Sequence, residues 1–330
     1  MRIGIAGAGA IGGFLGASLA RAGEAEVCAL ARGETLDALC KNGWRLEKSG
    51  DRIEAPVFAS DNPSELGQQD LLIIAVKGTS LPGLAPHLRP MIGPETVILP
   101  AMNGIPWWFC QVDGPFAPFT IKSVDPEDRI LVSLPTEQTL GCVVHIGASC
   151  PEPGVVKHAQ GNELILGDAT GGISDRTQRI AGVLARAGID IRLSDSIRSD
   201  IWFKLWGNLT MNPVSALTGA TLDRLLNDPL VTEFCSSAMR EAAAIGRKIG
   251  CPVLQEPEDR HAITRKLGAF KTSMLQDVEA GKAIELDSIV GAAHEIGRHF
   301  NMSTPHIDAL LGLTRLFARA RGLYPESASA

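Results

Sequence analysis

The chain has 330 residues, 45% of them hydrophobic and 21% charged, values typical of a water-soluble protein with enough apolar material for two domains. Its formal net charge of −6 excludes the broad basic surface that nucleic acids and anionic membranes require. The seven cysteines include no C-x-x-C pair and the seven histidines show no ligand spacing. We therefore expect a cytoplasmic protein without a disulfide framework, metal site or membrane span.

The amino-terminal segment has the pattern of a strand, a glycine-rich turn and a helix. A short apolar run over 2–6 is followed by a G-x-G-x-x-G sequence and then by helical character up to residue 22. In that setting the three glycines permit a tight turn, close approach to a pyrophosphate, and close packing of helix on strand. The helix N-terminus offers N–H groups to the phosphates. The predicted dinucleotide site comprises Gly7, Ala8, Gly9, Ala10, Ile11 and Gly12.

A second predicted strand, 26–31, is followed directly by Arg32. Sites for NAD usually carry Asp or Glu here to bind the ribose 2′-hydroxyl, and this sequence has neither at the strand end. A guanidinium suits a 2′-phosphate because its planar fork binds two oxygens. The pattern favours NADPH over NADH, and the alternative is an arginine that only faces solvent.

Two nearly continuous apolar runs follow, 70–76 and 96–99, as expected of buried parallel strands. Parallel strands joined by helices predict a doubly wound, Rossmann-type sheet that binds its ligand at the carboxyl ends of the strands. The residues that come after these strands, Lys77 and Asn103 with Gly104, are therefore candidates for the site.

The region 105–136 is less regular and reads either as a lid near the site or as a packed surface loop. Short strands are expected at 141–145, 155–158 and 163–166, extending the sheet in a partly antiparallel way. A helix over 174–187 and a last strand over 189–193 follow.

From residue 195 onward the strand pattern stops. Helical periodicity is found over 197–211, 230–249, 261–280, 285–300 and 305–320, punctuated by Pro213, Pro252 and Gly281. The predicted fold is an α/β Rossmann-type N-terminal domain with a parallel core sheet, 1–194, and an all-α C-terminal domain, 195–330. The tail 325–330 is predicted to be disordered.

One predicted helix carries Lys204, Asn208 and Asn212, which share a face because they recur every four residues. Their neighbours are largely apolar, and burying such groups without partners costs several kcal/mol. Either a ligand satisfies them, or Lys204 pairs with a carboxylate and the asparagines cap the helix end.

A second polar group comes later in the chain. Ser273 could donate to a substrate carboxylate, and Glu285 stands at a predicted helix start, where acids are also favoured for structural reasons. Asp277 and Asp287 suit caps or structural pairs equally well.

This ordered set of residues resembles the ketopantoate reductase (2-dehydropantoate 2-reductase) family over nearly the whole chain. The motifs that carry the resemblance are Gly7–Gly12 with Arg32, Val76-Lys77, Asn103-Gly104, the Lys204–Asn208–Asn212-Pro213 helix, 273–277 and 285–287. The resemblance implies NADPH-dependent reduction of 2-dehydropantoate to pantoate, a step of pantothenate and coenzyme A biosynthesis, in the cytoplasm.

The resemblance also implies roles. Lys204 is the general acid, and Glu285 holds the nascent hydroxyl or orients the lysine. Asn103 places the carbonyl beside the nicotinamide, and Lys77 lies near the cofactor. Ser273 and Asn208 bind the carboxylate of a small 2-oxo acid, and Asn212 is either a further substrate contact or a helix cap.

Trp107 and Trp108 add bulk beyond the compact family pattern, and they could form an apolar wall for a larger substrate or anchor the loop. Reduction of a bulkier 2-oxo acid is therefore the alternative function. A non-catalytic NADP-binding regulator is a third reading. The helical domain could also form a homodimer through an apolar face.

Overall fold

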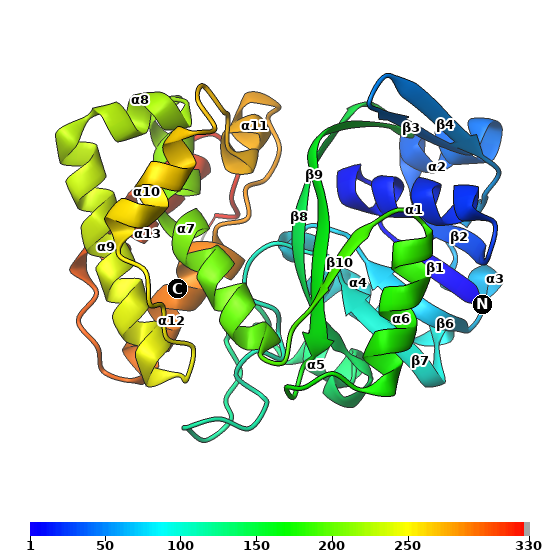
Figure 1. Cartoon of the computed structure of the whole chain (residues 1–330), viewed down its shortest axis with the longest axis horizontal. Helices are drawn as coiled ribbons and strands as arrows, with labels where there is room; N and C mark the ends of the chain where they lie inside the picture. Colours follow the sequence, from blue (N-terminus) through cyan, green and yellow to red (C-terminus); the bar gives the residue numbers. More distant parts are fainter. Residues whose placement is uncertain (327–330) are drawn as a thin grey trace. The chain divides into compact units, whose positions relative to one another are not determined.

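The computed structural model describes residues 1–326, so 327–330 of the predicted tail lie outside the described residues. The chain divides into two units. Figure 1 shows the whole chain, coloured by residue number from blue to red. The first comprises Met1–Val112 with Glu127–Asp200, and the second Asp113–Pro126 with the chain from Ile201 onward. The division into a domain 1–194 and a domain 195–330 stays a prediction.

A five-stranded parallel sheet forms the centre of the first unit (Figure 1). Its central strand β1 is apolar, with Ile3 and Ile5 fully buried. The predicted parallel sheet is confirmed. The nearly continuous apolar runs of the sequence form strands of this sheet, as expected of strands that are buried on both faces. In spatial order the strands are β5 (Phe58–Ser60), β2 (Glu26–Leu30), β1 (Arg2–Ala6), β6 (Gln69–Ile74) and β7 (Ile92–Pro100).

Helices connect these parallel strands. The first, α1, contacts strands of this sheet and of a second one, and its buried residues belong to the hydrophobic core cluster that these strands form. The connecting elements are α1 (Ala10–Ala22), α2 (Gly33–Asn42), α3 (Pro63–Leu66), the 3-10 turn η1 (Gly78–Ser80), α4 (Leu81–Leu84) and η2 (Ala85–Met91).

The second sheet corrects the prediction that the later strands extend the first one. Strands β8 (Leu140–Glu152) and β9 (Val155–Asp168) form one long hairpin in place of three short strands. Strand β9 also pairs with β10 (Asp190–Leu193) and β3 (Trp44–Lys48), and β3 pairs with β4 (Asp51–Ala55). The middle of β9 is exposed and polar, so its apolar pattern breaks while its ladder of hydrogen bonds continues.

The remaining elements of the first unit are short, apart from helix α6 (Asp175–Arg186), which is close to its predicted bounds. Helix α5 (Arg129–Ser133) and the 3-10 turn η3 (Thr136–Gln138) follow the irregular region. Trp107 and Trp108 are 1% and 0% exposed, and the Trp107 Nε1 donates to Leu134 O at 3.3 Å. The tryptophans therefore anchor this region in the core.

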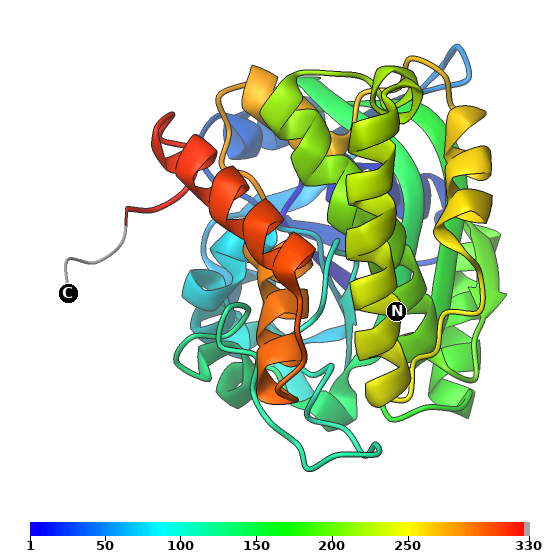
Figure 2. The same cartoon turned by 90° about the vertical axis from the view of Figure 1, so that its left-hand side faces the viewer.

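The second unit is built from helices. Figure 2 shows the long helix α9, in yellow-green, with the orange to red α12 and α13 against it. The helices are α7 (Ile197–Thr218), which begins in the first unit, α8 (Leu222–Asn227), α9 (Pro229–Lys248), α10 (Pro257–Arg265), α11 (Ser273–Glu279), the π-helical turn η4 (Asp287–Gly291), α12 (Ala292–His299) and α13 (Pro305–Arg319).

Three helix predictions need correction. Helix α7 continues through Pro213 to Thr218, although a proline inside a helix removes one hydrogen bond and crowds the carbonyl four residues earlier. The predicted helix 261–280 is two helices, α10 and α11, separated at Gly268, whose φ of +63° favours glycine. The predicted helix 285–300 begins with the π-helical turn.

The segment 113–126 packs on α12. The ring of Phe119 stacks on His299 at a centroid distance of 3.8 Å. The backbone N–H groups of Lys122 and Ser123 donate to the Glu295 carboxylate at 2.6 and 2.7 Å. These contacts favour a packed loop over a free lid.

Helix α10 carries a buried histidine with a measurable consequence. His261 is 1% exposed, its Nε2 has no hydrogen-bond partner among the described residues, and burial lowers its pKa below the ordinary value of 6.5. The unfolded chain therefore takes up this proton first as the pH falls. The stabilisation is complete above pH 6.5 and is lost as the pH falls from there through the folded-state pKa.

We expect the melting temperature to fall more steeply below pH 6.5 in the wild type than in His261→Gln, which cannot titrate. In terms of the free energy of unfolding, the slopes of the two proteins against pH should differ by at most about 1.4 kcal/mol per pH unit. Thermal unfolding across this range checks it, with His87→Gln at an exposed position as the control. Equal slopes in the wild type and His261→Gln would contradict the assignment.

Candidate active site

The glycine turn after β1 has the geometry that its sequence predicts. Gly7 has φ +96° and its N–H donates to Leu30 O at 3.0 Å. A Cβ at Gly12 would lie 1.9 Å from Gly7 O, so no larger residue fits there without backbone movement. The first and third glycines therefore permit the tight turn and the close helix–strand approach.

The N-terminus of α1 suits an anion. Gly9 is the N-cap residue, no side chain caps the helix, and its first turn contains no acid. A Cβ built on Gly9 would meet nothing within 4 Å, so the space beside this glycine is open. The N–H groups of the first turn are thus available to a pyrophosphate, and these residues fit a dinucleotide cofactor.

The other cofactor candidates follow neighbouring strands of the same sheet. Arg32 comes shortly after β2, Lys77 after β6 and Asn103 after β7. Strands β2 and β6 lie on either side of β1, β7 lies beside β6, and all are parallel, so the structure brings all three residues and the glycine turn to the carboxyl edge of the sheet. This is the point where the strand order reverses, where doubly wound sheets bind ligands.

The surroundings of these residues differ. Arg32 is the N-cap residue of α2, is exposed, and makes no side-chain hydrogen bond or ion pair within residues 1–326. Lys77 is half-buried, and its carbonyl accepts from Ser80 N at 2.9 Å. Asn103 is also half-buried and precedes Gly104, whose φ is +84°.

In the second unit, two tryptophans set the orientation of α7. Trp202 and Trp206 are fully buried, and their Nε1 atoms donate to Ala242 O at 3.2 Å and Met239 O at 2.8 Å on α9. Lys204 follows Trp202 by two residues, which is about 200° around a helix. The face with Lys204, Asn208 and Asn212 is therefore turned away from α9.

The asparagines on this face have hydrogen-bonding capacity to offer. Asn212 is 6% exposed and Asn208 is half-buried, and neither amide makes a side-chain hydrogen bond within the described residues. Because α7 continues to Thr218, neither asparagine caps its end, and the predicted alternative of a helix cap is wrong. Half-buried Lys204 lies one turn before Asn208 on the same face.

A further cation lies against α7. The Arg260 guanidinium of α10 is 5.6 Å from the Phe203 ring centroid and packs over Gly207, where a Cβ would meet its Nε at 2.8 Å. Burial lowers the pKa of Arg260. Arg260 could not be predicted as a neighbour of α7, because nothing in its local sequence pattern indicates this contact.

Ser273 and Glu285 come from separate segments of the second unit. Ser273 is the exposed first residue of α11, and Thr272 caps that helix by accepting from Leu275 N. The Ser273 hydroxyl is thus not used for capping. Glu285 is half-buried just before the π-helical turn, and Asp287 in that turn has a structural partner in Tyr324.

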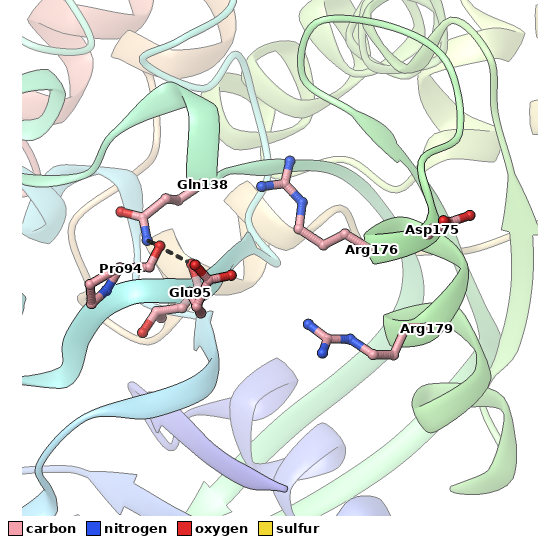
Figure 3. Close-up of a pocket in the computed structure, with 7 residues that line it drawn as sticks. Pro94, Glu95, Gln138, Asp175, Arg176 and Arg179 are labelled. Carbon is pink, nitrogen blue, oxygen red and sulfur yellow. Dashed lines mark hydrogen bonds between the residues drawn. The ribbon is translucent and has the colours of Figure 1, made fainter.

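A pocket of about 290 Å³ lies elsewhere in the first unit (Figure 3). Arg176 and Arg179 extend from α6 beside Pro94 and Glu95 at the beginning of β7. The cofactor candidates follow the carboxyl ends of the strands, whereas this pocket is at the amino end of β7, so it is not part of their site.

Clusters of metal ligands, disulfides and membrane-spanning helices are all absent from the described residues. No group of three His, Cys, Asp or Glu side chains in residues 1–326 could hold a metal ion. None of the seven cysteines, all of them within that range, forms a disulfide. No helix of the described chain has both the length and the apolar character needed to cross a membrane.

Comparison with known proteins identifies the family. The ketopantoate reductase PanE/ApbA family model matches residues 3–171, and the model of its C-terminal part matches 196–318. The 2-dehydropantoate 2-reductase of Mesorhizobium japonicum is 39% identical over 325 residues, which cover 98% of this chain and 100% of that protein.

Solved structures agree with these matches. A provisionally assigned ketopantoate reductase from Ralstonia solanacearum MolK2 has a TM-score of 0.95 and 51% identity, covering 98% of this chain and 99% of that one. A 2-dehydropantoate 2-reductase from Methylococcus capsulatus has a TM-score of 0.82 and 28% identity, covering 97% and 98%. The chain is an oxidoreductase that belongs to the ketopantoate reductase family.

Proposed function

We propose that this protein reduces 2-dehydropantoate to pantoate with NADPH. The observation that carries the proposal is the polar face of α7, where Lys204 is followed by two asparagines whose amides make no hydrogen bond within the described residues. Such a face inside an apolar helix suits a small polar ligand that has both a carbonyl and a carboxylate. The 39% identical relative bears the name of this reaction.

The preference for NADPH rests on Arg32. A nicotinamide dinucleotide suits the glycine turn in either form, and the two forms differ only at the 2′ position of the adenosine ribose. The exposed guanidinium after β2 has no protein partner among the described residues, so it is available to a 2′-phosphate.

The roles of the residues follow from the charge changes in the reaction. When bound, the reduced cofactor supplies a hydride to the ketone carbon. Lys204 donates a proton to the ketone oxygen, and its positive charge stabilises the negative charge that develops there. Glu285 accepts a hydrogen bond from the new hydroxyl or orients the lysine ammonium.

The remaining residues bind and orient. Asn208, Asn212 and Ser273 donate hydrogen bonds to the substrate carboxylate, and Asn103 orients the carbonyl for hydride transfer. Lys77 contributes to cofactor binding. In this proposal neutral donors hold the carboxylate of the small 2-oxo acid, and the Lys204 ammonium binds its reacting oxygen.

Steady-state kinetics with a panel of 2-oxo acids tests the proposal. Purified protein and NADPH are assayed with 2-dehydropantoate and with bulkier acids that carry an aromatic or longer branched side chain. We expect the highest kcat/KM with 2-dehydropantoate. Turnover of a bulkier acid alone would reject this substrate and retain the residue roles, and tight NADPH binding without any turnover would identify a regulator.

A further inference from the structure

We propose that Tyr324 is a positioning residue for Glu285, acting through the π-helical turn that follows this glutamate. The inference rests on the proposed function, in which Glu285 contacts the reacting oxygen or orients Lys204. It concerns the segment from Leu323 to Tyr324, hereafter the carboxy-terminal tether, which follows α13 and packs on the Glu285 segment.

The tether makes one contact on each side of Glu285. The Ile284 N–H donates to Leu323 O at 3.1 Å, and the Tyr324 hydroxyl donates to Asp287 Oδ1 at 2.6 Å. The tether is itself fixed to the end of α13, because Leu323 N donates to Ala318 O at 2.8 Å. Ile284, just before Glu285, and Asp287, two residues after it, are thus both held by groups that are distant in sequence.

The chain held by the tether has an uncommon conformation. The N–H groups of Ile289, Val290 and Gly291 all point to Leu286 O, at 3.3, 2.8 and 3.1 Å. Single π-helical turns are rare, less regular than an α-helix, and frequent at functional sites. A conformation of this kind persists where surrounding contacts determine it, and the tether supplies such contacts.

Burial strengthens the tether. Ile284 and Leu286, on either side of Glu285, are fully buried, so the backbone there cannot shift without disturbing the core. Burial raises the pKa of the Asp287 carboxyl, and its hydrogen bond from Tyr324 opposes that rise. Burial and the neighbouring carboxylate raise the pKa of Tyr324, so the hydroxyl keeps the proton that it donates.

The tyrosine ring is also held in place. The Arg319 guanidinium lies 5.5 Å from the ring centroid, and its Nε donates to Pro325 O at 3.0 Å. Arg315 and Arg319 both act electrostatically on the Asp287–Tyr324 pair. Tyr324 is the only tyrosine of the chain, so a single substitution removes this hydroxyl group selectively.

Removing the hydroxyl leaves a largely buried carboxylate without its donor, so the π-helical turn should relax and Glu285 should move. Catalysis is sensitive to misplacement of this kind, and about 1 Å can cost 10²-fold in rate. Substrate binding should change less, because the proposed carboxylate donors belong to α7 and α11. The expected signature is a lower kcat at nearly constant KM.

The test compares Tyr324→Phe with the wild type by steady-state kinetics and by hydrogen–deuterium exchange of peptides covering 283–291. We expect kcat to fall about tenfold, the effect of losing one hydrogen bond to a charged group, with KM for both substrates nearly unchanged. Exchange should become faster over 283–291 and stay unchanged over α9. Arg321→Ala, which removes a side chain that lies over Phe317, is the matched control and should behave as the wild type.

Each outcome decides the proposal. Unchanged kcat and unchanged exchange over 283–291 would overturn it, and so would faster exchange over the whole second unit with kcat and KM altered together. The wild type and Lys204→Ala are assayed first. If the wild type lacks turnover, the proposed function fails, and unchanged exchange in Tyr324→Phe would reject the tether separately.

Discussion

We expect replacement of Lys204 by alanine to lower kcat by about 10²–10⁴-fold, the usual effect of losing a general acid. The lysine lies on the face of α7 that is turned away from α9, one turn before Asn208, and its neighbours are largely apolar. In the proposed mechanism the substitution removes both the proton donor and the positive charge at the developing alkoxide. The affinity for NADPH should change little, because the cofactor candidates belong to the parallel sheet of the first unit.

Two measurements separate this effect from misfolding. The dissociation constant of NADPH, measured by fluorescence titration, shows whether the first unit of the variant is still folded and able to bind the cofactor. Lys204→Arg keeps the charge and loses the easily released proton, so we expect it to recover only part of the rate. A Lys204→Ala enzyme with nearly wild-type kcat would refute the role of the lysine.

We expect replacement of Arg32 by alanine to weaken NADPH binding by about 10–100-fold, the range for hydrogen bonds to a charged group. The reason is the loss of a guanidinium that has no protein partner among the described residues and follows β2, where the adenosine ribose binds in doubly wound folds. Binding of NADH, which lacks the 2′-phosphate, should stay unchanged. Titration of both cofactors against both proteins measures the ratio.

Arg21→Ala is the matched control for this prediction. Arg21 is exposed in the last turn of α1, so its loss changes the net charge equally at a site away from the glycine turn. We expect its cofactor affinities to match the wild type. Equal loss of NADPH and NADH affinity in Arg32→Ala would contradict recognition of the 2′-phosphate.

The parts of the fold that local chemistry determines could be predicted from the sequence. The turn at Gly7 needs a positive φ, and the contact at Gly12 leaves no room for a Cβ. The spacing of the glycines therefore predicts the turn directly. The strands of the parallel sheet are buried on both faces and read as continuous apolar runs. The shared face of Lys204, Asn208 and Asn212 follows from helical periodicity alone.

Features that depend on distant partners could not be predicted in this way. Strand β9 is continuous because β8 pairs along most of its length, although exposed polar residues interrupt its pattern. Helix α7 passes Pro213 because packing on α9 stabilises it beyond one lost hydrogen bond. Asp287, in the π-helical turn after Glu285, accepts a hydrogen bond from Tyr324, which lies 37 residues further along the chain.

The most direct test of the proposed function is the initial rate of NADPH oxidation by the purified protein with 2-dehydropantoate, measured beside Lys204→Ala. Our account predicts rapid oxidation that requires the 2-oxo acid and that falls by about 10²–10⁴-fold in the variant. No oxidation with 2-dehydropantoate, or oxidation that is equally fast without Lys204, would contradict it.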